Sequence, residues 1–381
     1  MSKEENVSNI YRIAVDAMGG DRGPEVIIGG VFDALARLPF NDFVVILVGK
    51  QSEIVAILNS HEYRAKHKKY LSRLSIIDAS EIVLMEDKPG MAHNRKPNSS
   101  IARGIGLLKE KEADAFVSAG NTGVVVFNAI RQLGCFPGLI RPAISGVIPT
   151  QNGICVVLDL GANVDCKPRH LFQFANMGLA YARKVLKIAL PRLGLLNIGK
   201  EEGKGNNTAR AAYDLLGKIP GFIGNVEGKD IPRGIADVVV CDGFVGNVML
   251  KFGEGIFSAI KRIFGNMPTW EKIAAIFGTI QLIFPPLLLL LFNPSFLLLA
   301  FVPSWALAAL LISPAARYVI RRFDYREYGG APLLGVDGVV IVCHGRSSSA
   351  AIKNAIRQAR LAVEQDVNSE IEKQLVSINS D

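Results

Sequence analysis

The fold class is first indicated by the stretch Tyr11-Arg-Ile-Ala-Val-Asp-Ala-Met-Gly-Gly-Asp-Arg-Gly-Pro24. It begins with a short apolar run bounded by turn residues, which is typical of a buried strand. The glycines predict a tight loop, and Pro24 suits the first turn of a helix that we expect to reach Leu38. A strand, a glycine-rich loop and a helix therefore follow each other at the start of the chain.

The same succession recurs along the chain. Further strands are expected at 43–48, 76–78, 114–119, 154–160, 193–198, 236–241 and 339–343. Further helices are expected at 51–59, 101–112, 169–187 and 350–367, with Ser99 or Ser100 as the N-cap of the second. Three more are expected to begin at 120–123, just after 206 and just after 247, and the last two of these to end at 216 and about 264. This alternation predicts an α/β fold with a doubly wound, mostly parallel sheet.

The loops after the expected strands are the candidate site. In parallel sheets the loops at the carboxyl ends of the strands gather along one edge, where ligands bind. We therefore expect six loops to face one cleft: 16–24, 119–123, 161–165, 199–206, 242–247 and 344–349. Backbone N–H groups of glycine-rich loops and helix N-termini bind phosphate and other anions, so these loops predict an anion site.

A long apolar stretch, Ile273 to Ala316, interrupts this pattern. No charged side chain occurs between Lys272 and Arg317, and Asn293-Pro294 divides the stretch into two arms. Each arm has the roughly 20 residues that a membrane-spanning helix needs. The stretch therefore predicts an apolar helical hairpin.

The flanks and prolines of this hairpin bear on how it meets a membrane. Basic residues on both sides favour both ends staying at the cytoplasmic face, near anionic headgroups. Prolines within both arms favour shallow insertion over a complete crossing. A partly inserted hairpin is preferred, and a two-span hairpin and an apolar protein–protein contact remain open. The residues expected to contact the membrane include Ile273, Leu289, Phe292, Leu298 and Trp305.

These features give a domain organisation. We expect a flexible N-terminus at 1–10, an α/β catalytic domain formed by 11–264 and 323–367, a membrane-docking helical insertion at 265–322, and a C-terminal tail at 368–381. The polar start, Met-Ser-Lys-Glu-Glu-Asn, is not typical of a signal peptide.

Charge and cysteine spacing narrow the functional classes. The net charge of +8 favours an acidic partner, such as a carrier protein or anionic lipid, and no nucleic-acid-binding signature is present. The five cysteines match no metal or redox motif, and buried free thiols favour a reducing compartment. The chain has no Walker motif, no dinucleotide fingerprint and no Gly-x-Ser-x-Gly elbow, so we expect no nucleotide and no serine acyl-enzyme.

Three polar residues on the loops could carry chemistry. Lys204 stands between two glycines, as either a solvated loop lysine or an anion-binding or catalytic cation. Asn247 stands at an expected helix start, as an N-cap or as an amide donor to a developing oxyanion, and both roles can hold. His344 has no acid near it in sequence, which favours a structural role. Carboxylates such as Asp16 lie on separate loops and do not favour a metal site.

Ordered motifs along the chain resemble those of the bacterial phosphate acyltransferase (PlsX) family, from about residue 11 to residue 365. They are Ile13-Ala-Val-Asp-Ala-Met-Gly-Gly-Asp21, Asn98-Ser-Ser100, Ser118-Ala-Gly-Asn-Thr-Gly123, Leu160-Gly-Ala-Asn-Val-Asp165, Leu195-Leu-Asn-Ile-Gly199 with Lys204-Gly-Asn206, Phe222-Ile-Gly-Asn-Val-Glu227, Asp242-Gly-Phe-Val-Gly-Asn247, Tyr328-Gly-Gly-Ala331 and His344-Gly345. The apolar stretch 273–316 departs from the family, whose members carry a shorter, amphipathic helical tip in that region.

The resemblance implies an enzyme that moves a fatty acyl group from acyl carrier protein to inorganic phosphate. It implies a homodimer with a phosphotransacetylase-like or isocitrate-dehydrogenase-like fold, and a product that a membrane glycerol-phosphate acyltransferase uses for phospholipid synthesis. Lys204 and Asn247 match the family's active-site lysine and asparagine. Other residues of the matching loops are expected to bind phosphate or substrate: Asp16, Gly19, Gly20, Asn98, Ser99, Gly120, Asn121, Thr122, Gly123, Asn163, Gly205, Asn206, Gly246 and His344.

Thiolate is a good leaving group, so the reaction demands no strong general acid. No metal, nucleotide or other cofactor is expected. The enzyme is expected in the cytoplasm, attached to the inner face of the membrane through 273–316. Two alternatives remain: a non-catalytic membrane scaffold that binds acyl carrier protein, and a phosphotransacetylase that uses short acyl-CoA.

Overall fold

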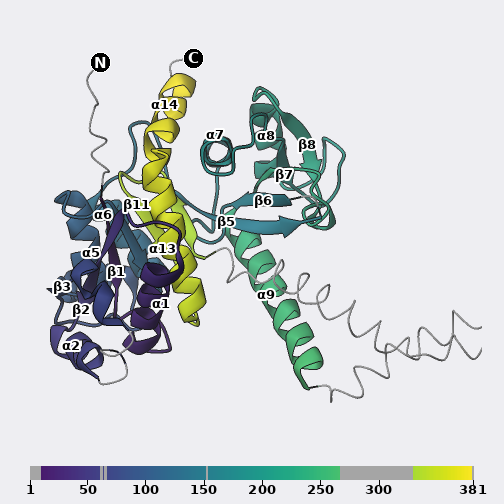
Figure 1. Cartoon of the computed structure of the whole chain (residues 1–381). Helices are drawn as coiled ribbons and strands as arrows, with labels where there is room; N and C mark the ends of the chain where they lie inside the picture. Colours follow the sequence, from purple (N-terminus) through teal and green to yellow (C-terminus); the bar gives the residue numbers. More distant parts are fainter. Residues whose placement is uncertain (1–9, 61–62, 64–66, 152, 267–328, 380–381) are drawn as a thin grey trace, which may run out of the picture. The chain divides into compact units, whose positions relative to one another are not determined.

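The computed structural model describes residues 10–60, 63, 67–151, 153–266 and 329–379 (Figure 1). The chain divides into two compact units, one formed by Met1–Val248 and Tyr325–Asp381 and the other by Met249–Asp324. Of the second unit, the described part belongs to helix α9 (Gly243–Asn266). The expected N-terminus 1–10 and insertion 265–322 lie almost wholly outside the described residues.

One eleven-stranded sheet runs through the first unit in the order β3-β2-β1-β4-β11-β10-β5-β6-β9-β7-β8. Its strands are β1 (Tyr11–Asp16), β2 (Phe43–Gly49), β3 (Leu74–Asp78), β4 (Ala115–Ser118), β5 (Ala143–Thr150), β6 (Gly153–Leu158), β7 (Leu193–Leu196), β8 (Phe222–Val226), β9 (Val238–Val240), β10 (Ala331–Leu334) and β11 (Val339–Val342). The expectation of an α/β fold with a large, mostly parallel sheet is confirmed, and β5, β8 and β10 are additions to the expected strands.

The sheet consists of two parallel blocks that run in opposite directions. Strands β3, β2, β1, β4 and β11 form one block, and β6, β9, β7 and β8 form the other. Between the blocks, β10 is antiparallel to β11 and β5, and β5 is antiparallel to β6. The β5–β6 connection is too short for the crossover that parallel strands need, so the direction reverses there.

This reversal divides the six loops that the sequence predicts to face one cleft into two sets, by the direction of the strands that they follow. Loops 16–24, 119–123 and 344–349 follow β1, β4 and β11, whereas loops 161–165, 199–206 and 242–247 follow β6, β7 and β9. The two sets therefore follow blocks of strands that run in opposite directions. We call them the first loop set and the second loop set.

The helices are α1 (Pro24–Arg37), α2 (Gln51–Asn59), α4 (Pro89–Arg95), α5 (Ser100–Lys109), α6 (Thr122–Gln132), α7 (Pro168–Lys184), α8 (Asn207–Leu216), α9, α13 (Ser349–Glu364) and α14 (Val367–Asn379), with short 3₁₀ turns at η1 (Lys68–Arg73) and η2 (Gly228–Asp230). The expected helices occur in the expected order, and α4 and α14 are additions to them. The bounds of α2 and the N-cap role of Ser99 are confirmed, since Ser99 Oγ accepts the N–H of Ala102.

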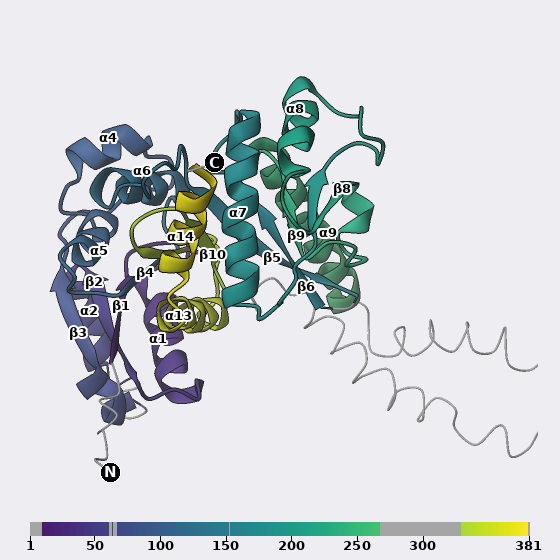
Figure 2. The same ribbon diagram turned by 90° about the horizontal axis from the view of Figure 1, so that it is seen from above.

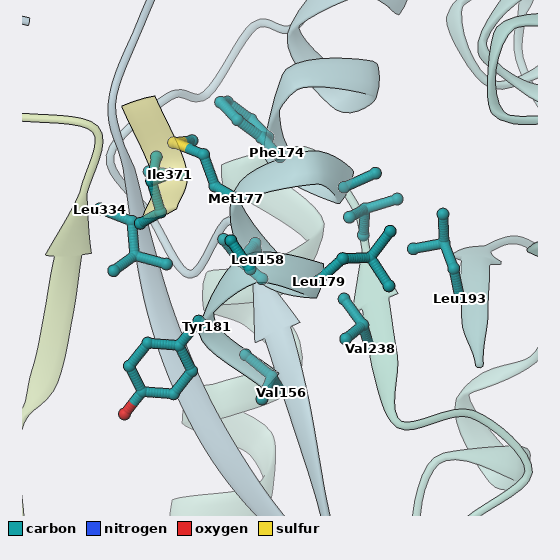
Figure 3. Packing of buried hydrophobic residues seen from close by; sticks show 14 of the residues in the cluster. Val156, Leu158, Phe174, Met177, Leu179, Tyr181, Leu193, Val238, Leu334 and Ile371 are labelled. Carbon is teal, nitrogen blue, oxygen red and sulfur yellow. The ribbon is translucent and has the colours of Figure 1, made fainter. Parts of the chain in front are cut away.

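Two buried apolar clusters hold the first unit together. One lies between α1, α13 and the strands around β1, and includes Phe32 and Ile356. The other surrounds α7, where Phe174, Met177 and Tyr181 pack against residues of β6, β9 and β10 (Figure 3). Each cluster lies under one parallel block, so each loop set is supported by its own core.

Helix α14 corrects the prediction of a C-terminal tail at 368–381. It lies beside α7 in both views (Figures 1 and 2), with Val367, Ile371 and Leu375 buried. Arg183 of α7 donates to the Gln374 side chain at 2.6 Å, which ties the two helices together. Most of the tail is therefore part of the second core.

Candidate active site

Lys204 lies on the loop that joins β7 to α8, in the second loop set. The loop's two lysines differ in their contacts. Lys200 Nζ lies 3.4 Å from the buried carboxylate of Asp230. Lys204 is exposed, and its Nζ has no ion-pair or hydrogen-bond partner within the described ranges. Its ammonium is therefore available to an anionic ligand.

Asn247 lies in the second turn of α9. The helix begins at Gly243, and Asp242 Oδ1 accepts the N–H of Val245 at 2.8 Å, so Asp242 is the N-cap. The prediction that Asn247 could be the N-cap is wrong. Its exposed side chain packs beside the loop after β6, where a Cβ atom built on Gly161 would lie 3.4 Å from Asn247 Cβ.

The loops of Lys204 and Asn247 leave the same edge of the sheet. Strands β7 and β9 are parallel neighbours, with Leu195 opposite Val240. Strand β6 is the parallel neighbour of β9 on its other side, and it leads into loop 161–165. An ammonium and a side-chain amide thus follow adjacent strands, which is the arrangement predicted for these two residues.

A buried carboxylate, Asp159, shapes the loop beside Asn247. Its two oxygens accept N–H bonds from Ile144, Gly161, Ala162 and Asn163 at 2.6 to 3.2 Å, and the Asn163 amide donates to it at 2.9 Å. Burial raises the pKa of Asp159. Asn163, expected to bind substrate, is itself buried and also donates to Pro142 O at 2.7 Å. It supports the loop from within.

The first loop set is organised by another buried carboxylate, Asp16. Ser118 Oγ donates to Asp16 Oδ2 at 2.6 Å, and the N–H of Gly120 donates to Ser118 Oγ at 3.0 Å. Burial raises the pKa of Asp16, against opposing hydrogen bonds that include those from Ser100 and Ser118. With Asp16 only 1% exposed, its carboxylate holds the β1 and β4 loops together rather than facing solvent.

Backbone contacts complete the first loop set. The N–H of Asp21 donates to Gly345 O at 2.8 Å, which joins the loops after β1 and β11. Gly19 lies close to Gly120, because a Cβ atom on Gly19 would come within 2.7 Å of the Gly120 nitrogen. Gly19, Gly20 and Gly120, which are among the predicted binding residues, thus lie on loops that leave one edge of the sheet.

Three predicted binding residues are helix caps. Asn121 Oδ1 accepts the N–H of Val124, while its amide donates to the carbonyls of Leu84, Met85 and Asp87. Asn206 Oδ1 accepts the N–H of Ala209 at 2.8 Å and caps α8. Ser99, already described, caps α5 in the same way. The oxygens of these three side chains are engaged by the chain itself.

Four predicted residues remain at the surface or partly buried in the first unit. Asn98 is exposed, and its N–H donates to Glu81 Oε2 at 2.7 Å. Thr122 and Gly123 form the first turn of α6. His344 Nδ1 accepts the N–H of Arg346 at 3.0 Å, so a neutral His344 carries its proton on Nε2. Thr122, Gly123 and His344 belong to the first loop set, and Asn98 directly precedes the N-cap of α5.

The predicted membrane residues, Ile273, Leu289, Phe292, Leu298 and Trp305, lie outside the described residues. In the part of the chain that the structure describes, no helix combines the length and apolar character needed to cross a membrane. Nor do three or more His, Cys, Asp or Glu side chains of that part come together as metal ligands.

Comparison with known proteins shows the family to which the chain belongs. The family model described as "Fatty acid synthesis protein" matches residues 11–282 and 301–370. A phosphate acyltransferase of Heliobacterium modesticaldum is 44% identical over 365 residues, which cover 96% of this chain and 97% of the relative. A phosphate acyltransferase of Dictyoglomus thermophilum is 42% identical over 363 residues, covering 94% and 96%.

A solved structure defines the fold class. The phosphotransacetylase of Streptococcus pyogenes superposes with a TM-score of 0.56 at 17% identity, covering 94% of this chain and 95% of that chain. The first unit therefore has a phosphotransacetylase-like mixed α/β fold. The chain belongs to the phosphate acyltransferase (PlsX) family, and it is an acyltransferase that acts on phosphate.

Proposed function

We propose that this enzyme transfers a fatty acyl group from acyl carrier protein to inorganic phosphate, giving an acyl phosphate for phospholipid synthesis. The observation that carries the proposal is the exposed ammonium of Lys204, which has no partner among the described residues, on the loop beside the strand that leads to Asn247. A phosphate dianion and a thioester carbonyl need these two kinds of group.

Each group has a role in the proposed reaction. The Lys204 ammonium binds phosphate, as a charge-assisted donor to its oxygens. A phosphate oxygen attacks the thioester carbon, forming a C–O bond while the carbonyl π electrons move to oxygen. The Asn247 amide donates to that oxyanion. The oxyanion then collapses, the C–S bond breaks, and the carrier thiolate leaves with the electron pair and takes a proton from solvent.

The partners of the proposed reaction follow from charge and from the family match. The net charge of +8 supports docking of an acidic acyl carrier protein. Residues 283–300 fall between the two segments that the family model matches. This supports additional residues within the apolar stretch 273–316. In the proposed function that stretch attaches a cytoplasmic homodimer to the inner membrane face. There the product reaches a membrane glycerol-phosphate acyltransferase.

The test is turnover of a long-chain acyl carrier protein thioester with phosphate by the full chain, with liposomes present. Acyl phosphate is trapped as the hydroxamate, and the released thiol is counted. Lys204→Ala should raise the KM for phosphate at least about tenfold, the worth of a lost charge-assisted hydrogen bond. Lys218→Ala, at another exposed lysine beyond α8, is the matched control and should behave as wild type.

Asn247→Ala should instead lower kcat by about 10²- to 10³-fold, as for loss of one oxyanion donor. Acetyl-CoA should be a poor donor in the same assay. Equal or better turnover of acetyl-CoA would favour a short-chain phosphotransacetylase, and absence of turnover with every donor would favour a binding scaffold. Removing 283–300 should leave turnover in detergent intact and reduce sedimentation with liposomes.

A further inference from the structure

The loop that carries Lys204 is braced by two asparagines from neighbouring strand ends. Asn197 follows β7, and its amide donates to Lys204 O at 3.0 Å and to Asn225 Oδ1 at 3.0 Å. Asn225 lies in β8, and its amide donates to Glu201 O at 2.8 Å. The pair therefore fixes two carbonyls of the loop, one of them that of Lys204 itself.

The backbone of the loop is built around this pair. Gly205 has φ +91°, and a Cβ atom on it would lie 2.5 Å from Asn197 Oδ1, so the Asn197 amide occupies the space of a side chain at 205. The N–H of Ile198 donates to Asn197 Oδ1 at 2.8 Å. Both ends of the loop thus converge on one side chain.

Asn225 suits this bracing because it is an amide and because it is buried. Only 6% of it is exposed, so its hydrogen bonds do not compete with water. It accepts from Asn197 and donates to Glu201 at the same time, which a carboxylate cannot do. Buried polar groups of this kind lose most when one partner is removed.

We propose that Asn225 is a positioning residue that sets where the Lys204 ammonium stands, acting through Asn197 and the 197–206 backbone. This inference rests on the proposed role of Lys204 in binding phosphate. Asn225 is not among the residues that the sequence predicts for the site, although its segment carries part of the family resemblance.

The test compares Asn225→Asp with Asn197→Asp, whose half-buried position makes folding the safer of the two. Both replace the loop-bracing donor by an oxygen that repels a carbonyl. Asn176→Asp in α7 is the matched control, because Asn176 is also buried, donates to Phe172 O at 2.8 Å and lies on a different element from the 197–206 loop. Each variant is assayed with the acyl donor and phosphate varied separately.

The expected result is a selective change in phosphate binding. Asn225→Asp and Asn197→Asp should raise the KM for phosphate about tenfold or more and leave the KM for the acyl donor unchanged. Trypsin should cleave after Lys200 and Lys204 several-fold faster in both variants than in wild type. Asn176→Asp should change neither KM nor the rate of cleavage at these two lysines.

Two outcomes overturn the inference. A lower rate with both KM values unchanged would mean that the asparagines only maintain the folded fraction. Unchanged cleavage at Lys200 and Lys204 would mean that they do not brace the loop. If Lys204→Ala itself leaves the KM for phosphate unchanged, the proposed phosphate role fails. If only Lys204→Ala raises it, the positioning inference alone fails.

Discussion

Replacing Gly246 by alanine should displace the first turns of α9 from the end of β6. A Cβ atom at 246 would lie 1.9 Å from Asp159 O and 3.1 Å from Cys241 Sγ. Ordinary contacts begin near 3.4 Å, so the two backbones must separate by about 1.5 Å. Asp159 is held by the N–H bonds of its loop, so the helix start is the part that moves.

The displacement has two consequences of calculable size. Forcing a methyl group into a closely packed contact costs about 1–3 kcal/mol of unfolding free energy. Asn247 is the next residue, and it moves with the turn. Because a misplacement of about 1 Å can cost about 100-fold in rate, kcat should fall by about that factor. The KM for phosphate should change little, since Lys204 lies on a different loop.

The assays are urea unfolding and acyl phosphate formation by the full chain. Gly253→Ala is the control, because it is the same substitution in the same helix and a Cβ there meets nothing within 4 Å. Alanine is favoured over glycine inside a helix, so Gly253→Ala should stabilise by about 0.5–1 kcal/mol. Wild-type stability and rate in Gly246→Ala would refute both the packing role of Gly246 and the assignment of Asn247.

Three further predictions concern the first unit. A hydrogen bond from Arg360 lowers the pKa of Asp42 in the folded protein. The pair therefore stabilises the fold above pH about 4, the ordinary aspartate value, and this stabilisation is lost as the pH falls through the lower folded pKa. In urea unfolding measured over a pH series, Asp42→Asn should remove this acid-dependent loss of stability. Ile371→Ala should cost about 2–5 kcal/mol in urea unfolding because Ile371 is fully buried, whereas Val376→Ala, half exposed on the same helix, should cost well under 1 kcal/mol. Burial raises the pKa of Cys343 to about 12, so this thiol should resist iodoacetamide at neutral pH until urea is added, as followed by mass spectrometry.

The local sequence predicts the strand–loop–helix units of this fold well, because glycine and proline residues mark the ends of the strands and helices. Pro24 begins α1 as expected, and the expected helix at 51–59 is α2. The direction of a strand within the sheet has no comparable local signal. It depends on β5 and β10, which carry Pro149 and Pro332, and prolines weaken the pattern of a strand.

Helix α14 shows a different limit. Its buried residues Val367, Ile371 and Leu375 recur every four positions, so an amphipathic signal is present in the sequence. A helix of this length is marginally stable alone, and its order comes from packing on α7. The spacing of the apolar residues can be read in the sequence, but the partner that covers them is known only from the fold, so from the sequence the segment is predicted as a tail.

The polar residues of the loops divide by whether the chain itself uses their hydrogen-bonding groups. A buried polar group is costly unless it is paired, so inward-facing groups such as Asp16 and Asn163 are satisfied within the loops. In sequence they cannot be told from ligand-binding groups, because both kinds follow strands and both precede helices. Lys204 and Asn247 differ from them in being exposed on a backbone that other residues hold in place. Inward-facing groups such as Asp159 and Asn225 fix the loops, and in the proposed function this rigidity holds the two exposed side chains in place for a ligand.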